Sequence, residues 1–416
     1  MARSRDKAPK VISLFSGAGG LDYGFEAAGY DSAFTNDFDR DSCETLRLNR
    51  RWPVVERSIY DVPSEEILAV AGLGKGDVDM LIGGPPCQPF SKSGYWAKGE
   101  SARLDDPRAA TLDAYLRVVE DLQPRAFLLE NVHGIAYSDK NEGLHLLLRR
   151  IREINRRTGT RYEPRYAVLN AAWYGVPQLR ERFFLIASRD GSVFNFPDRA
   201  FADPSEQQDL TGLRPYRTAW DALAGVRNDT SEDTAMRGKW AGLLPSIPEG
   251  QNYLWHTDRG GGLPLFGWRR RYWNFLLKLS KSLPSWTIQA QPGPAVGPFH
   301  WENRRLSHSE LCRIQTFPDN VHVYGGRTSV QRQIGNAVPS LLAEVLAREI
   351  KTQLLGFEKR ADPLKLLPPD RSPAPSPAPL APVPAAYRKF VGLHRAHPGT
   401  GKGPRSVQQH EQSLFV

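Results

Sequence analysis

The sequence is poor in cysteine and contains no long apolar run. Its three cysteines, Cys43, Cys87 and Cys312, are far apart and lack the spacing of a metal site. We therefore expect neither a disulfide framework nor a zinc site, and a reducing compartment fits this composition. No stretch approaches the ~20 apolar residues that a membrane helix needs. We also see no signal peptide, so we expect no contact with a membrane.

The excess of one sign of charge is also small. The 416 residues include 55 Lys and Arg against 46 Asp and Glu, a net charge of +9. This balance permits a polyanionic partner but does not demonstrate one. A nucleic-acid function must therefore be argued from local chemistry.

What the sequence does contain, in its first half, is short apolar runs that alternate with helical patterns. The runs that predict buried strands are Val11–Phe15, Asp31–Thr35, Val78–Ile82, Ala126–Leu129 and Phe183–Ala187. Strands that alternate with helices predict an α/β fold, with a mainly parallel sheet and helices on both faces. Ligands of such sheets bind at the carboxyl ends of the strands.

The character of the sequence changes after about residue 190, where Gly, Pro, Trp and Arg become frequent and periodicity fades. We predict a catalytic and cofactor-binding domain over residues 1–190, completed by residues 328–358. Residues 191–327 are expected to form a smaller, loop-rich domain. The Pro-rich residues 359–416 are expected to form a disordered tail.

A glycine-rich turn, Phe-Ser-Gly-Ala-Gly-Gly, covers residues 15–20 after the first expected strand. Glycine lets the backbone approach a ligand closely and permits positive φ. Asp37 follows the second strand, where an acid suits ribose hydroxyls. Together they indicate an adenosine-containing ligand, although a tight strand–helix turn without a ligand would use the same residues.

Cys87 and Glu130 stand at two further strand ends. Cys87 lies between prolines on a stiff loop, and a thiolate fixed on rigid backbone is a strong nucleophile. Glu130 follows a buried strand, where desolvation would raise its pKa and suit a general acid. The alternatives are a small core cysteine and a solvated glutamate near a helix start.

Arg180 and Arg182 alternate just before the expected strand Phe183–Ala187. Residues two apart in an extended segment point to one face. Two guanidiniums on one side could clamp a carbonyl or a phosphate. Solvated ion pairs are the alternative.

The order of these motifs along the chain resembles that of the cytosine-C5 DNA methyltransferases, and the resemblance covers residues 11–350. The matching segments are residues 14–20 (first motif), 84–91 (catalytic motif), 130–132 (Glu-Asn-Val), 178–182 (Gln-x-Arg-x-Arg), 305–319 (ninth motif) and 333–339 (tenth motif). Three serines depart from the family pattern. Ser13 and Ser58 stand where an acid is usual, and Ser309 stands where Arg is common.

The resemblance implies a Rossmann-like, S-adenosylmethionine-dependent sheet, with target recognition in residues 191–327. Cys87 would add to C6 of a cytosine flipped out of a specific duplex DNA sequence. Glu130 would bind or protonate N3, Arg182 would hold the O2 carbonyl, and Arg180 would support the loop and the nucleotide.

The resemblance also implies sets of binding residues. The residues expected to contact S-adenosylmethionine are Phe15, Gly17, Gly19, Gly20, Asp37, Pro85 and Asn336. Those expected to contact DNA are Gln88, Ser91, Arg269, Arg270 and Arg271. Tryptophans of the same region, including Trp255, are either DNA contacts or the aromatic core of a loop-rich domain.

The biological setting implied by the resemblance is that of a modification enzyme in a bacterial restriction–modification system. Such an enzyme would be a cytoplasmic monomer, associated with the nucleoid through DNA, and a cognate restriction endonuclease would share its site. Two other functions stay open: C5 methylation of RNA, and a catalytically inactive DNA-binding module. The intact Cys87, Glu130, Arg180 and Arg182 disfavour the second.

Overall fold

The computed structural model describes residues 7–86, 110–132, 142–205, 212–226, 232–268 and 273–393, and the statements below refer to these residues. Its contacts divide the chain into two compact units. Unit 1 comprises Met1–Thr234, Ser280–Pro292 and Leu306–Pro375. Unit 2 comprises Ala235–Leu279, Gly293–Arg305 and Ser376–Val416.

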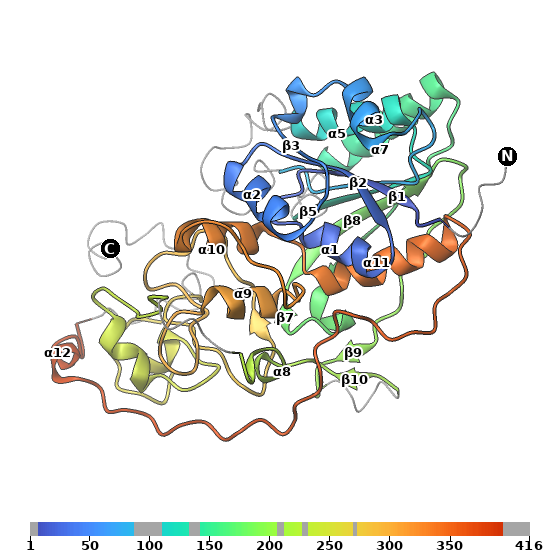
Figure 1. Ribbon diagram of the computed structural model, residues 1–416. Coiled ribbons are helices and arrows are strands. Elements are labelled where there is room, and N and C mark those ends of the chain that lie inside the picture. Colours follow the sequence, from blue (N-terminus) through green and yellow to red (C-terminus); the bar gives the residue numbers. More distant parts are fainter. Residues whose placement is uncertain are drawn as a thin grey trace. The chain divides into compact units, whose positions relative to one another are not determined.

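Unit 1 contains a seven-stranded sheet with strand order β3-β2-β1-β4-β5-β8-β6 (Figure 1). Its strands are β1 (Lys10–Leu14), β2 (Asp31–Asp37), β3 (Val54–Glu56), β4 (Met80–Gly83), β5 (Ala126–Val132), β6 (Arg165–Asn170) and β8 (Glu181–Ser188). The first five pair in parallel, whereas β8 runs antiparallel to both β5 and β6. The predicted α/β fold with a mainly parallel sheet is therefore confirmed. Strands β3 and β6 were not predicted from the sequence. Strand β3 has only three half-buried residues, and β6 begins with two exposed residues.

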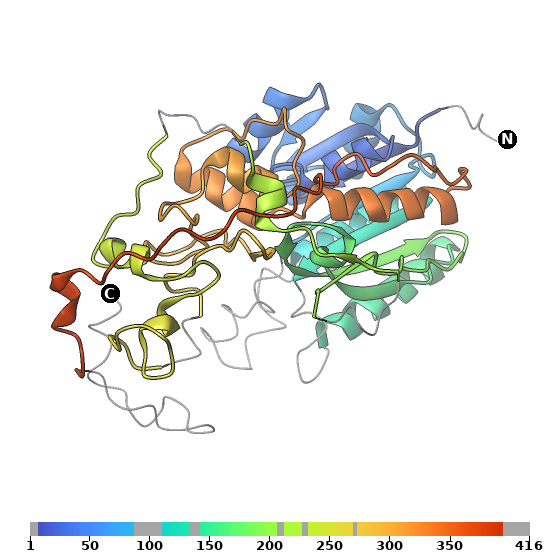
Figure 2. The same ribbon diagram turned by 90° about the horizontal axis from the view of Figure 1, so that it is seen from below.

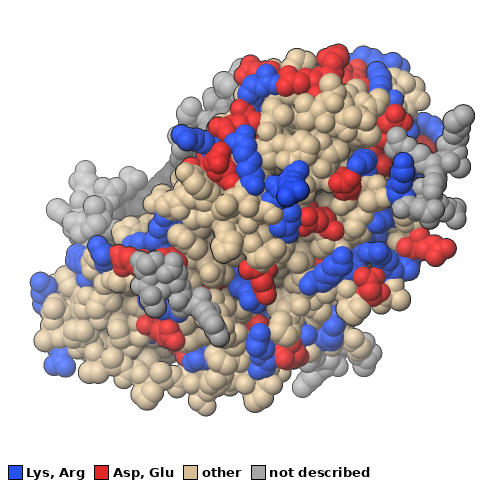
Figure 3. All heavy atoms as spheres, viewed as in Figure 1, with Lys and Arg blue, Asp and Glu red and all other residues tan. Residues whose placement is uncertain are grey.

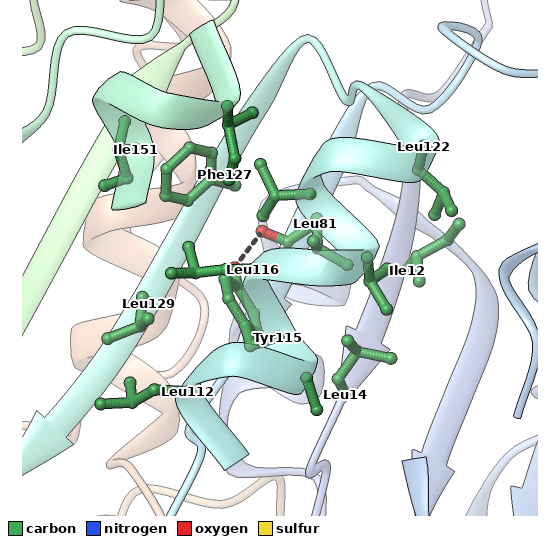
Figure 4. Close-up of a cluster of buried hydrophobic side chains, with 14 of the residues drawn as sticks. Ile12, Leu14, Leu81, Leu112, Tyr115, Leu116, Leu122, Phe127, Leu129 and Ile151 are labelled. Atoms are coloured by element: carbon green, nitrogen blue, oxygen red, sulfur yellow. Dashed lines mark hydrogen bonds between the residues drawn. The ribbon is translucent and has the colours of Figure 1, made fainter. Parts of the chain in front are cut away.

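Helices cover both faces of the sheet (Figure 1). On one face lie α3 (Ser64–Ala71), α5 (Ala110–Leu122) and α7 (Glu142–Thr158), and on the other lie α1 (Gly20–Ala27) and α11 (Ser340–Gln353). Figure 4 shows the core of the first face, where Tyr115 of α5 lies among side chains of the strands. Its buried hydroxyl donates to the Leu128 carbonyl at 2.8 Å, so the polar end of this ring is satisfied.

The contact between α1 and α11 depends on two glycines of α1. A Cβ on Gly24 would lie 2.4 Å from the Ala343 Cβ, and a Cβ on Gly20 would lie 2.3 Å from the Val338 carbonyl oxygen. Neither helix could approach the other this closely with a side chain at these positions. Helix α11 thus belongs to the same unit as the first glycine turn.

The remaining regular elements are short. In unit 1 they are α2 (Arg40–Asn49), α8 (Ala219–Leu223), α9 (His308–Ile314), α10 (Arg327–Asn336), β7 (Gln178–Leu179), β9 (Phe201–Ala202), β10 (Arg214–Pro215), β11 (Ser285–Trp286) and the 3-10 turns Ile59–Asp61 and Ala171–Tyr174. In unit 2 they are α12 (Ala385–Arg388) and the 3-10 turns Ala241–Ser246 and Tyr253–His256.

The observed units differ from the boundaries expected at residues 190 and 327. Residues 191–234, 280–292 and 306–327 belong to unit 1. The reason is long-range pairing: β11 runs parallel to β7, and α8 packs against α9. A loop-rich sequence without periodicity carries no local signal for such contacts.

The expectation of a disordered tail is wrong for residues 359–393. Leu364, Leu366 and Leu367 pack against the hydrophobic core that includes side chains of α11, and the Arg371 N–H donates to the Asp221 carboxylate of α8 at 2.6 Å. Figure 2 shows the backbone of this extended segment passing α8. Proline-rich composition suggested disorder, but an extended chain with leucines at its start can still bury them against a folded surface.

Unit 2 has an aromatic core of its own, to which the C-terminal segment contributes. Tyr387 of α12 stacks on Trp240, with ring centroids 5.7 Å apart and planes 19° apart. Trp255 packs against the edge of this core, and a Cβ on Gly261 would lie 2.4 Å from its indole. Trp255 thus follows the alternative of an aromatic core.

The surface in the view of Figure 3 carries Lys and Arg interspersed with Asp and Glu. This matches the modest net charge of +9. Within the described ranges, no helix combines the length and apolar character needed to cross a membrane.

Candidate active site

The glycine turn after β1 holds an unusual backbone conformation. Phe15 and Gly17 have φ values of 55° and 52°, in the left-handed region. The Gly17 N–H donates to the Asp37 carboxylate at 2.8 Å, and a Cβ on Gly17 would meet no atom within 4 Å. The turn therefore presents bare backbone to open space, while Asp37 fixes its conformation.

Asp37 ends β2 and has a second backbone partner. Its other carboxylate oxygen accepts from the Asp39 N–H at 2.9 Å. Burial raises the pKa of Asp37, and these backbone donors partly oppose that rise. Each carboxylate oxygen keeps a lone pair for a further donor, such as a ligand hydroxyl. The structure places the Asp37 carboxylate beside the glycine turn.

Phe38 follows Asp37 and is 70% exposed, the largest value among the exposed large hydrophobic side chains of the described chain. An exposed aromatic ring beside a turn without side chains offers a flat apolar face to a planar ligand. The sequence analysis missed Phe38, although an aromatic residue directly after the acid at a strand end was a readable signal.

Gly19 and Gly20 face the protein interior and have a packing reason of their own. A Cβ on Gly19 would lie 2.9 Å from the Leu46 side chain, and Gly20 lies against the Val338 carbonyl. Gly19 also caps α1 with a φ of 85°. The open part of the turn is therefore Phe15 to Gly17.

The loop after β4 meets the carboxylate of Glu130. A Cβ on Gly84 would lie 2.7 Å from Glu130 Oε2, so only glycine fits there. The Asn131 amide donates to the Pro85 carbonyl at 3.0 Å, and the Thr111 hydroxyl donates to the Pro86 carbonyl at 2.9 Å. Pro85 is buried by these contacts, whereas Pro86 is exposed.

The described part of this loop ends at Pro86. Cys87, Gln88 and Ser91 lie outside the described residues, as do Arg269, Arg270 and Arg271. The described residues do show that the Glu130 carboxylate lies against Gly84, three residues before Cys87 in the sequence.

Glu130 of β5 forms an ion pair with Arg182, the second residue of β8. The distance from Arg182 Nε to Glu130 Oε1 is 3.0 Å, and the two side chains are 15% and 11% exposed. Burial raises the pKa of Glu130, while Arg182 and Arg180 partly oppose this rise. Such a carboxyl can hold a proton nearer neutrality than a solvated glutamate can.

The Arg180 side chain has different hydrogen-bond partners from the Arg182 side chain. It is 1% exposed, and its guanidinium donates to the carbonyls of Ile288 at 3.1 Å, Gly335 at 2.7 Å and Ala337 at 2.9 Å. The expected clamp of two guanidiniums on one ligand is therefore wrong for Arg180, whose hydrogen bonds hold protein backbone. The backbone that Arg180 holds belongs to the Ile288 segment and to the end of α10.

Two glutamines extend this backbone support. Gln178 donates to Gln315 at 3.0 Å and accepts from the Ile288 N–H at 3.1 Å, and Gln315 donates to the Ile334 carbonyl at 2.6 Å. Three segments that are remote in sequence are thereby joined. Asn336, at the end of α10, stays exposed beside them.

The sheet register brings the strand ends to one edge. Leu14 of β1 lies opposite Gly83 of β4, and Gly83 lies opposite Leu129 of β5. Parallel pairing therefore places the glycine turn, residues 84–86 and Glu130 in succession along the carboxyl edge. Across the described residues, no group of three His, Cys, Asp or Glu side chains could hold a metal ion.

The comparison with protein families decides the identity of this site. Residues 9–352 match the profile of the C-5 cytosine-specific DNA methylases. The chain belongs to this family. It is thus a DNA cytosine-5 methyltransferase.

Individual relatives agree with this family membership. The chain is 43% identical over 378 residues to the type II methyltransferase M.SacI of Streptomyces achromogenes, a match that covers 84% of this chain and 94% of the relative. It is 32% identical to M.NgoFVII of Neisseria gonorrhoeae, covering 83% and 87%.

Solved structures of other proteins share the fold. One is a putative DNA modification methyltransferase encoded within an E. coli prophage, at a TM-score of 0.60, with 22% identity and coverage of 84% of this chain and 100% of that one. Another is the DNMT2 of Spodoptera frugiperda, at a TM-score of 0.57, with 16% identity and coverage of 82% and 99%. At these identities the likeness concerns the fold alone.

Proposed function

We propose that this DNA cytosine-5 methyltransferase transfers the methyl group of S-adenosylmethionine to a cytosine flipped out of a specific duplex sequence. The observation that carries the proposal is the contact of Glu130 with Gly84, three residues before Cys87. Glu130, whose pKa is raised by burial, therefore lies beside the segment that precedes the proposed nucleophile in sequence.

The cofactor end of the site fits S-adenosylmethionine. Gly17 offers backbone beside open space, and Asp37 keeps acceptor capacity for ribose hydroxyls. Phe38 offers an apolar face for adenine, while the exposed Asn336 closes the far side. The cofactor, when bound, supplies an electrophilic methyl group.

The residues of this chain would activate the other reactant. The Cys87 thiolate adds to C6 of the ring, and Glu130 donates a hydrogen bond or proton to N3 as negative charge develops there. Arg182 holds Glu130 and offers a second donor to the O2 carbonyl. C5 then forms its bond to the methyl group as the bond between that methyl and the sulfonium sulfur breaks, which leaves a neutral thioether; a base takes the C5 proton, and the C6–sulfur bond breaks to release Cys87.

Sequence recognition is assigned to the loop-rich region that includes unit 2. Arg269, Arg270 and Arg271 are its proposed contacts to base edges or phosphates. Arg259 adds a described candidate, because its guanidinium lies 4.6 Å above the Trp268 ring and is held ready to stack or donate.

The relatives are type II methyltransferases, which supports a modification role in a restriction–modification system. In that role the chain would act as a cytoplasmic monomer on DNA, and an endonuclease would cut the same sequence. Methylation of RNA is the competing function.

The deciding experiment is methyl transfer from labelled S-adenosylmethionine to duplex DNA and to tRNA, followed by bisulfite sequencing. We expect C5 methylation of one DNA sequence and none of tRNA. Transfer to tRNA alone would contradict the proposal.

The role of Cys87 needs its own test. Cys87→Ala should abolish transfer, and DNA with 5-fluorocytosine should trap a covalent adduct, because fluorine cannot leave as a proton does. Cys312→Ala is the matched control, since burial raises the pKa of Cys312 to about 12 and keeps it unreactive. An active Cys87→Ala protein would remove Cys87 from the mechanism.

A further inference from the structure

The first turn of α1 contains a buried acid to which the proposed chemistry assigns no role. Asp22 is 2% exposed, and the Ser13 hydroxyl is the one side chain near enough to stabilise its carboxylate, at a geometry short of a full hydrogen bond. The great majority of buried side-chain polar atoms in proteins are paired. An unpaired buried carboxyl in the helix that starts at the glycine turn therefore needs an explanation.

A pair of hydroxyls connects the surroundings of Asp22 with the open part of the turn. The Ser13 side chain lies near the Asp22 carboxyl and stabilises its charged form in part. Ser13 Oγ is 2.8 Å from Ser16 Oγ, and Ser16 is half-buried in the turn itself. A polar route thus runs from Asp22 through Ser13 and Ser16 to the face on which the cofactor is proposed to bind.

The charged groups that act on Asp22 are both acids: Asp37 of β2 and Glu26 of α1. The charged side chains of the neighbouring elements are paired among themselves. These pairs are Arg50 with Glu26, Arg332 with Asp39 of the α2 cap, and Arg348 with Glu344 of α11. Among the described residues, no cation forms an ion pair with Asp22.

A carboxylate in such a place is costly unless a positive charge comes near it. Burial raises the pKa of Asp22 to about 7, against an ordinary value of 3.8. Near neutral pH the free protein therefore contains Asp22 in both protonation states. A cation that arrives on the other side of the two serines would favour the ionised state.

S-adenosylmethionine carries an ammonium and a sulfonium group. We propose that Asp22 is a positioning residue for this methyl donor, which gives up its proton when the cationic cofactor occupies the turn and orients the cofactor's ammonium group through Ser13 and Ser16. The inference rests on the proposed cofactor site and adds to it a residue and a proton.

The test is calorimetric titration of the full-length protein with S-adenosylmethionine from pH 5.5 to 7.5, in two buffers of different ionisation enthalpy. The wild type should bind about tenfold more tightly at pH 7.5 than at pH 5.5 and release a fraction of a proton, because linkage ties affinity to the ionisation of Asp22. Asp22→Asn should lose both effects. The ligand's own amine, with a pKa of ~8, titrates equally in both proteins.

Glu26→Gln is the matched control, since Glu26 is on the same helix one turn later and pairs with Arg50. It should keep the proton release and the pH dependence, with the midpoint moved to lower pH because Glu26 no longer raises the pKa of Asp22. Ser16→Ala, which interrupts the hydroxyl route without altering Asp22, should reduce the proton release. Melting curves confirm that each variant is folded.

The outcomes separate the two proposals. If Asp22→Asn keeps the proton release and pH dependence of the wild type, or if Ser16→Ala leaves the release unchanged, the role of Asp22 is overturned. If the wild type itself does not bind S-adenosylmethionine at any pH, the proposed cofactor site fails instead.

Discussion

Arg180 and Arg182 should respond differently to substitution by alanine: the first change should lower stability, and the second should lower activity. Arg180 is 1% exposed and donates to three backbone carbonyls, whereas Arg182 pairs with Glu130 at the edge of the site. Arg180→Ala should therefore destabilise the protein. Arg182→Ala should remove activity with a small change in stability.

The magnitude follows from the hydrogen bonds that Arg180 makes. Truncation removes this donor from the carbonyls of Ile288, Gly335 and Ala337. The Ala337 carbonyl keeps the Gln315 amide as a donor at 3.2 Å, and each buried group that is left unsatisfied costs about 1–3 kcal/mol. Partial relaxation and water entry lower the sum, so we expect a loss of about 3–5 kcal/mol. A unit of this size loses roughly 2–4 °C per kcal/mol, which predicts a melting temperature about 10 °C lower.

The Arg182→Ala protein supplies the comparison. Its Glu130 can take up a proton, because burial already raises the pKa of that carboxyl, so we expect a stability loss of about 1 kcal/mol. Circular dichroism melts and methyl transfer to duplex DNA measure the two quantities. An Arg180→Ala protein that melts with the wild type would refute the reasoning, as would an Arg182→Ala protein with full activity.

Three further predictions follow from the structure. Glu130→Gln should lower the rate of methyl transfer about 100-fold or more while S-adenosylmethionine binding, followed by calorimetry, stays unchanged; a wild-type rate would remove Glu130 from acid catalysis. Ending the chain after Pro375, or Tyr387→Ala, should destabilise unit 2 by about 3 kcal/mol in urea titrations followed by tryptophan fluorescence, because Tyr387 stacks on Trp240 in its core; an unchanged midpoint would make the segment dispensable. Asp22→Asn should stabilise the fold, by about 2 kcal/mol more at pH 8 than at pH 5.5. The reason is that the raised pKa of Asp22 makes its ionisation destabilising above the unfolded-state pKa, and fully so above pH 7. Equal gains in stability at both pH values would show that Asp22 does not titrate there.

The sequence alone determined the parallel sheet, the order of its motifs and the strand ends at which they lie. Short apolar runs and glycine turns are local features, so their positions can be read from neighbouring residues. Parallel topology then brings their carboxyl ends to one edge, where the structure joins Asp37 to the glycine turn.

The separate tasks of Arg180 and Arg182 could not be predicted in this way. Both have the same side chain in the same motif, and alternation suggested a common face. The difference arises because carbonyls from Ile288 and Gly335, more than a hundred residues away, surround Arg180 and leave Arg182 to Glu130.

Tertiary structure also decided that the C-terminal segment is packed and that Asp22 is buried. Proline content describes how the chain behaves alone, but Leu367 and Tyr387 are held by surfaces formed elsewhere in the sequence. Asp22 is a charged residue in the first turn of a helix, and only the packing around α1 removes it from water. Local sequence specifies backbone conformation, whereas burial, and with it the charge state of an acid, depends on which distant segments cover it.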